Sequence, residues 1–176
     1  IGAPQDRVIT TGNLKYDVPL PSPPAIVEQL RRALSGAGPV LVCGSTVEGE
    51  ELLLLGAFTN ILANHGGAVL LLAPRHPQRF DEVERLLREV KIPFWRRSKW
   101  AGGPIRGGVL LVDSIGELSA LYALADIAFV GGSLVPRGGH NIIEPAQHGV
   151  AIVVGNHTEN FRDIVGLFQS RDAVRV

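Results

Sequence analysis

The fold class of this chain can be inferred starting from the segment Val40-Leu41-Val42-Cys43-Gly44-Ser45-Thr46. Its first four residues are all apolar, and half of them are β-branched, which is typical of a strand buried on both faces. A turn follows, and then a helical pattern over residues 48–64. A buried strand, a turn and a helix in this order indicate one unit of an α/β domain.

The same unit recurs along the rest of the chain. Apolar runs predict further strands at 68–73, 109–112, 127–130 and 151–154, with a weaker one at 92–95. Helical patterns follow at 78–90, 117–125 and 141–148, and a last helix begins near Asn160. The sequence therefore predicts an α/β fold with a doubly wound parallel sheet. Ligands of such sheets bind beyond the carboxyl ends of the strands, so we expect the site in the loops that follow those strands.

Length and composition limit the class of protein. The 176 residues suit one domain, and 17 basic and 17 acidic residues give a net charge of zero. No overall positive field attracts nucleic acid, and no apolar run approaches the roughly 20 residues of a membrane-spanning helix. We expect residues 1–24, which are rich in proline, to form a linker, and residues 25–176 to form one binding domain truncated at its C-terminus. Methionine is absent, even at the first position, so we expect a piece of a longer protein.

Two candidate sites follow the first two strands. Ser45 and Glu48 have the spacing of a capping box at a helix start. The alternative is that Ser45, Thr46 and the free amides there hold an anion such as a phosphate. Arg75 and His76 stand between two prolines after the second strand, which suits either a solvated turn or recognition of a phosphate. The Gly-Lys-Ser/Thr of an ATP-binding loop and the glycine spacing of a dinucleotide-binding loop are both missing, so we expect no such cofactor.

Two more candidates follow later strands. Ser114 and Glu117 again have capping-box spacing, and the backbone near Ile115 and Gly116 is open to a nucleobase. The segment 131–148 is the richest in candidates. Its glycines, Gly138 and Gly139 among them, allow a ligand to approach the backbone closely.

Within that segment, Asn141 and Glu144 favour a helix cap, with Asn141 as the N-cap. Alternatively, Asn141 binds a phosphate and Glu144 accepts hydrogen bonds from sugar hydroxyls. A metal site of His140, Glu144 and His148 conflicts with that cap, and we expect no metal. The basic segment 91–106 contains Trp95 and Trp100, and we favour a solvated loop with inward-facing aromatic side chains over a nucleic-acid or membrane surface.

Six motifs together resemble one known family. They are Thr10-Thr11-Gly12-Asn13-Leu14-Lys15-Tyr16-Asp17, Gly44-Ser45-Thr46 with Glu48-Gly49-Glu50, Leu72-Ala73-Pro74-Arg75-His76-Pro77, Arg96-Arg97-Ser98, Val112-Asp113-Ser114-Ile115-Gly116-Glu117-Leu118, and the run from Gly131 to Pro145. Their order and contexts resemble the Kdo transferases, which transfer 3-deoxy-D-manno-octulosonic acid (Kdo) in lipopolysaccharide synthesis. The resemblance covers nearly the whole chain, although Lys99, Trp100 and the neighbouring glycines depart from it.

The resemblance implies a two-domain GT-B glycosyltransferase, with this chain as most of the Rossmann-like C-terminal, donor-binding domain. The donor would be CMP-Kdo, the acceptor a lipid A precursor, and the reaction an inversion at the anomeric carbon without metal or other cofactor. Arg75, with His76 beside it, would contact the CMP phosphate, the backbone at Ile115 and Gly116 the cytosine, and Asn141 and Glu144 the phosphate, ribose or Kdo hydroxyls. Ser45, Thr46, Gly138 and Gly139 would lie nearby.

The resemblance also places the general base, the acceptor site and the membrane contact on a missing N-terminal domain. The parent enzyme would work at the cytoplasmic face of the bacterial inner membrane, and this domain alone would be soluble and would bind CMP or CMP-Kdo without turnover. The alternatives are another GT-B enzyme, such as a UDP-sugar transferase or a nucleotide-sugar 2-epimerase, or a non-catalytic nucleotide-binding module.

Overall fold

The computed structural model describes residues 2, 4–9 and 24–176. The predicted motif at 10–17 and most of the predicted linker lie outside this part of the chain. Before the gap, Gln5–Arg7 form a short 3-10 helix.

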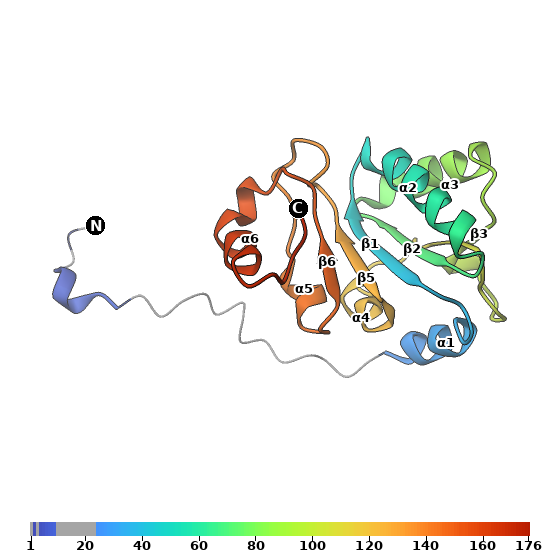
Figure 1. Ribbon diagram of the computed structural model, residues 1–176, viewed down its shortest axis with the longest axis horizontal. Coiled ribbons are helices and arrows are strands. Elements are labelled where there is room, and N and C mark those ends of the chain that lie inside the picture. The colour runs from blue at the N-terminus through green and yellow to red at the C-terminus, as the bar shows by residue number, and fades with distance from the viewer. Residues whose placement is uncertain (1, 3, 10–23) are drawn as a thin grey trace.

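Six parallel strands form one sheet in the order β3-β4-β2-β1-β5-β6 (Figure 1). Their bounds are Val40–Thr46 for β1, Val69–Pro74 for β2, Phe94–Arg96 for β3, Gly108–Leu111 for β4, Ile127–Val130 for β5 and Ala151–Val153 for β6. Every predicted strand is present, with ends displaced by up to three residues. The doubly wound parallel sheet is confirmed.

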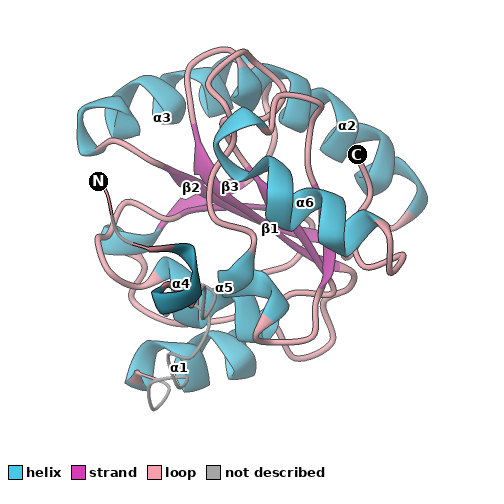
Figure 2. Ribbon diagram, turned by 90° about the vertical axis from the view of Figure 1, so that its left-hand side faces the viewer, coloured by secondary structure: helices cyan, strands magenta, loops and turns pink. Residues whose placement is uncertain are grey.

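Helices cover both faces of this sheet (Figure 2). They are α1 at Ala25–Ala33, α2 at Glu50–Asn64, α3 at Phe80–Glu89, α4 at Leu118–Leu121, α5 at Ile143–Ala146 and α6 at Arg162–Gln169. Helices α2 and α3 lie on one side, and α1, α4 and α5 lie on the other. The sequence analysis assigned no element to residues 25–33, although Ile26, Val27, Leu30 and Ala33 of α1 are buried at helical spacing.

Alternating side chains of the central strands fill two core clusters. Val40 and Val42 of β1 face the cluster under α1 and α4, whereas Cys43 faces the one under α2 and α3. Strands β2 and β4 alternate in the same way, which is why their sequences are apolar throughout. Burial, together with the nearby Glu50 carboxylate, raises the pKa of the Cys43 thiol to about 12, so this cysteine acts as a packed apolar residue.

The direction of winding reverses at β1. The chain passes from β1 through α2 to β2 on one side, and later crosses from β4 through α4 to β5 on the other side. Right-handed crossovers in opposite directions place their helices on opposite faces. The loops after β1 and β5 therefore meet at the switch point, where open α/β sheets bind ligands.

The first turn differs from the prediction. Ser45 and Thr46 belong to β1, and α2 begins at Glu50 after Gly49, whose φ of 92° no helical residue adopts. No side chain caps this helix, so the predicted capping box of Ser45 and Glu48 is wrong. Ser45 has a φ of 55°, and the register between β1 and β2 shifts between Gly44 and Thr46. The strand thus ends in a bulge at the site, where such backbone strain is frequent.

Candidate functional site

Four strand ends supply the candidate site: β1, β2, β4 and β5. The Arg75 N–H after β2 donates to the Thr46 carbonyl at 2.9 Å, and the Gly131 N–H after β5 donates to the Gly44 carbonyl at 2.8 Å. These backbone bonds join three of the loops directly. The structure thereby brings Ser45, the Arg75 loop and the start of the glycine-rich segment to one edge of the sheet.

A buried carboxylate braces the switch point. Glu50 is 0% exposed and accepts backbone N–H bonds from Val47 at 3.0 Å, Gly132 at 2.8 Å, and Ser133 and Leu134 at 2.9 Å each. Four donors compensate the cost of burying the charge. Three consecutive amides that could have bound a ligand anion are thus already occupied by Glu50.

The role of Glu50 was not predicted, because three of its four partners lie more than 80 residues away. An acidic residue in the first turn of a helix is ordinary, so the local sequence carried no signal for this brace. The Gly131 position shows how tightly the brace fits, since a Cβ there would lie 2.8 Å from the Glu50 Oε2 and 2.4 Å from the Ser45 carbonyl oxygen.

The Thr46 hydroxyl points into the protein. The Thr46 side chain is fully buried, and its hydroxyl donates to Glu51 at 2.8 Å. Glu51 also pairs with Arg79, which leads into α3. Thr46 therefore supports the loop from inside, and its hydroxyl is already engaged by Glu51.

Arg75 and His76 project from the loop after β2 and are both exposed. They lie near His140, which follows the glycine-rich segment. Burial lowers the pKa of His140, and the positive charge of Arg75 and then that of His76 lower it further, against the opposing effect of Glu50. The His140 Nε2 is buried, has no hydrogen-bond partner among the described residues, and lies 2.9 Å from where a Gly132 Cβ would stand. A neutral imidazole and two neighbouring basic side chains thus share one place.

Gly138 and Gly139 are buried and have φ angles of 81° and 76°. A Cβ on Gly138 would lie 2.3 Å from the Asn160 Nδ2, and one on Gly139 would lie 3.1 Å from the His157 carbonyl oxygen. The Asn160 N–H also donates to the Gly138 carbonyl at 2.9 Å. Close packing of the loop after β6 therefore requires these glycines, independently of any ligand.

Asn141 and Glu144 lie at the start of the short helix α5. The Asn141 Oδ1 accepts from the Ile143 N–H at 3.1 Å, and its Nδ2 lies 3.4 Å from the Glu144 Oε1. The prediction of Asn141 as the N-cap is wrong: Ile142 occupies the N-cap position without a side-chain cap, and Asn141 lies one residue before it. The half-buried Glu144 lies near Tyr122, whose pKa is raised chiefly by burial and then by the Glu144 charge.

The loop after β4 presents Ile115 and Gly116 to solvent. Ile115 is 71% exposed, and Gly116 has a φ of 83° with nothing within 4 Å of its Cβ position. The predicted capping box is wrong here too, because the Ser114 hydroxyl donates to the Glu117 carboxylate and no side chain caps α4. The backbone at Ile115 and Gly116 is nonetheless exposed, as the sequence predicted.

The basic segment 91–106 is mostly engaged with the protein itself. Arg96 and Arg97 pair with carboxylates, the Arg106 Nη2 donates to the Ser35 carbonyl at 2.9 Å, and Trp95 and Trp100 pack against the first core cluster. The favoured interpretation, a loop with inward-facing aromatic side chains, is confirmed. Because these arginines are already paired, little positive charge is left for the alternative interpretation, a surface that binds nucleic acid or membrane.

The described residues also bear on metal binding and membrane spans. The His148 Nε2 lies 3.0 Å from the Ser119 carbonyl oxygen, and residues 2, 4–9 and 24–176 contain no cluster of three or more His, Cys, Asp or Glu side chains placed to hold a metal. Over the same residues, no helix has the length and apolar character needed to cross a membrane.

The sequence of this chain is similar to those of several known proteins. The chain is 39% identical over 165 residues to the 3-deoxy-D-manno-octulosonic acid transferase of Haemophilus influenzae, and 41% identical over 172 residues to that of Bordetella pertussis. Each match covers 93% of this chain but only 39% and 38% of the relative, respectively. No protein-family model matches the chain.

One solved structure is matched by this chain over a larger share of its own length than the two curated relatives are. The crystal structure of the C-terminal CMP-Kdo binding domain of WaaA from Acinetobacter baumannii superposes with a TM-score of 0.78 at 37% identity. The match covers 86% of this chain and 81% of that domain. The shared fold thus extends over most of both chains.

Proposed function

Because this chain belongs to the family of 3-deoxy-D-manno-octulosonic acid transferases, we propose that it is the donor-binding domain of such an enzyme and binds CMP-Kdo. The binding site is the edge formed by the ends of β1, β2, β4 and β5. The observation that carries this proposal is the convergence of Arg75, His76 and His140 at the carboxyl edge of the sheet, the edge from which the exposed loop at 115–116 also projects. The domain extends over residues 25–176, and residues 1–24 lead into it.

Each part of the donor meets a group of matching chemistry. Arg75 pairs with the phosphate, because a guanidinium donates two parallel hydrogen bonds to phosphate oxygens, and His76 adds a further donor. The backbone at Ile115 and Gly116 binds the cytosine. Asn141 and Glu144 hold the ribose or Kdo hydroxyls and the phosphate edge. Ser45, Gly138 and Gly139 shape the floor of the site.

In the chemical step, the main task of this domain is to stabilise the leaving group. The bond between the anomeric carbon of Kdo and the phosphate oxygen breaks, and its electron pair goes to CMP. The acceptor hydroxyl loses its proton to a general base and attacks the anomeric carbon from the face opposite the phosphate. This attack inverts the configuration of the anomeric carbon. Arg75 stabilises the charge that develops on the phosphate, a form of catalysis that needs a preorganised cation but no metal.

The remaining parts of the reaction belong to the rest of the enzyme. The general base, the lipid A precursor acceptor site and the membrane contact lie on a second, N-terminal domain, and the enzyme adds Kdo to the lipopolysaccharide core at the cytoplasmic face of the bacterial inner membrane. This division fits a chain that matches 38–39% of the length of its curated relatives. The 176-residue chain alone binds donor without turning it over.

Calorimetric titration of the chain with CMP, UMP and UDP tests the proposal. We expect CMP to bind more tightly than either uridine nucleotide. Arg75→Ala should weaken CMP binding about tenfold or more, because hydrogen bonds to charged groups contribute about 1.5–3 kcal/mol. Arg31→Ala, which removes an exposed arginine from α1, is the matched control and should leave the affinity unchanged.

Three results would contradict the proposal. Tighter binding of UDP would indicate a UDP-sugar transferase or an epimerase domain. If Arg75→Ala and Arg31→Ala changed the affinity for CMP equally, the phosphate would not bind at the end of β2. Intact Kdo transfer by a full-length enzyme that carries Arg75→Ala and Glu144→Gln would favour a non-catalytic nucleotide-binding module.

A further inference from the structure

Three consecutive residues at the end of β3 hold the loop after β4 at both of its ends. Arg96 and Ser98 bind Asp113, where the loop leaves the strand, and Arg97 binds Glu117, where the loop enters α4. The sequence analysis noted Arg96-Arg97-Ser98 as a motif and gave it no role. The proposed donor contacts do not include these residues.

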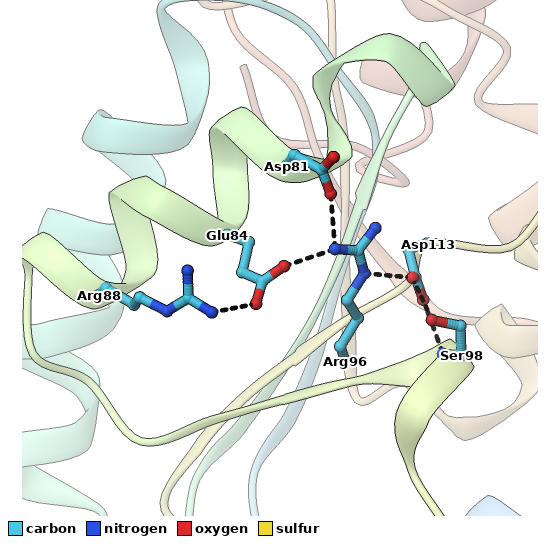
Figure 3. Close-up of polar contacts among 6 residues, drawn as sticks. All are labelled: Asp81, Glu84, Arg88, Arg96, Ser98 and Asp113. Carbon is cyan, nitrogen blue, oxygen red and sulfur yellow. Dashed lines mark hydrogen bonds and ion pairs between the residues drawn. The ribbon is translucent and has the colours of Figure 1, made fainter.

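The first end of the loop is held by an ion-pair network (Figure 3). Asp113 accepts from the Arg96 Nε, from the Ser98 hydroxyl, and from the Ser98 N–H at 2.7 Å. The same guanidinium contacts Asp81 at 2.6 Å and also contacts Glu84, both on α3. Burial alone would raise the pKa of Asp113, but the hydrogen bonds from Ser98 and Arg96 lower it overall. Arg96 therefore ties the loop to a helix of the core.

The second end is held by a single ion pair. The Arg97 Nη2 lies 2.9 Å from the Glu117 Oε1, and the Ser114 hydroxyl donates to the other oxygen of the same carboxylate. The Arg97 and Glu117 side chains are 22% and 21% exposed. The pair joins the end of β3 to the start of α4, so its loss acts first on the loop between them.

The residues between the two ends have no such support. Ile115 is largely exposed, and Gly116 adopts a left-handed conformation with open space around it. A glycine loop of this kind has many accessible conformations. The two clamped ends restrict the positions that the backbone groups between them can take.

Recognition of a base depends on those positions. Cytosine presents an amino donor at C4 and an acceptor at N3, whereas uracil presents an acceptor at C4 and a donor at N3. A backbone carbonyl and N–H tell them apart only when each lies within hydrogen-bonding distance of the correct atom. A loop that can shift by an ångström accommodates either base.

We propose that Arg96, Arg97 and Ser98 are positioning residues for base selection: they hold the Ser114–Gly116 backbone in the one conformation that accepts cytosine and rejects uracil. This inference rests on the proposed function, since it requires the base to bind at this loop. It adds a source of specificity outside the residues that touch the donor. The effect passes from α3 and β3 through Asp113 and Glu117 to the loop.

The test measures the ratio of the Kd for UMP to the Kd for CMP. Arg97→Gln and Glu117→Gln should each lower this ratio about threefold or more, because a misplaced backbone group loses its discrimination. The charge-exchanged double variant Arg97→Glu with Glu117→Arg should recover part of the ratio. Arg88→Gln is the matched control, because Arg88 pairs with Glu84 in the same network but is 62% exposed and does not contact the loop.

Thermal unfolding of each variant separates positioning from general destabilisation. We expect the melting temperatures of Arg97→Gln and Arg88→Gln to lie close to that of the wild-type chain. A wild-type ratio in a folded Arg97→Gln chain would overturn the inference and leave the proposed function intact. A wild-type chain with no preference for CMP would overturn the proposed function, and the inference with it.

Discussion

Gly44, at the end of β1, leaves no room for a side chain. A Cβ there would lie 2.1 Å from the Tyr122 hydroxyl oxygen and 3.0 Å from the Leu118 Cδ1. Tyr122 is 1% exposed and cannot move without disturbing the core. Gly44 therefore permits the segment after β4 to pack against the end of β1.

We predict that Gly44→Ala lowers the free energy of unfolding by about 1–3 kcal/mol, the usual cost of overpacking a core. Gly56→Ala is the matched control, because Gly56 is exposed in the middle of α2 with nothing within 4 Å of its Cβ position. That change should leave stability unaltered or raise it by up to about 1 kcal/mol, since alanine favours a helix over glycine. Urea unfolding of both variants measures the difference, and equal effects would contradict this packing.

At the scale of elements, the Glu50 carboxylate joins α2 to the loop after β5. The two segments are far apart in the chain and meet only because β1 and β5 are neighbours in the sheet. The adjacent Glu51 is equally buried but faces Thr46 and Arg79 instead. The two glutamates thus brace different loops from one helix turn.

We predict that Glu50→Gln raises the hydrogen-exchange rates of the Gly132, Ser133 and Leu134 amides about tenfold or more. Glutamine offers one acceptor oxygen where the carboxylate offers two, and each buried N–H left without a partner costs about 1–3 kcal/mol. Glu51→Gln should destabilise the Arg79 contact but leave these three amides protected. Similar exchange in both variants would show that Glu50 does not hold the loop.

Much of the element order could be predicted from the sequence, for a definite reason. Strands such as β2, buried on both faces, are apolar at every position, and this pattern is unmistakable between turns. Helix starts were less predictable. Helix α2 begins two residues late because Gly49 has a positive φ, and α5 begins at Ile143 with Ile142, not Asn141, at its N-cap. Helix α1 was missed although its buried positions have a regular helical spacing.

The site residues that directly follow strands could be predicted from the sequence. The residues whose role depends on partners far along the chain could not. Arg75, His76, Ile115 and Gly116 follow strands directly, and the parallel sheet brings their loops to one edge. Glu50, the partner of the β5 loop, and Arg97, the partner of Glu117, act across long sequence separations. Local spacing carries no signal for such contacts, and the two capping boxes inferred from it were wrong.

At the scale of the whole molecule, the account is that one edge of the sheet binds a cytidine monophosphate unit. The phosphate lies at Arg75 and the base at the loop of Ile115 and Gly116. A hollow elsewhere on the molecule, lined by β6 and the C-terminal residues 172–175, offers a contrasting location for a ligand. The two places are far enough apart along the sheet order to be distinguished by any direct structural method.

A crystal structure of the 176-residue chain with CMP tests this account most directly. We predict the phosphate within hydrogen-bonding distance of the Arg75 guanidinium, with the cytosine against the Ile115–Gly116 backbone. CMP bound in the hollow beside β6, or with its phosphate away from Arg75, would contradict the account.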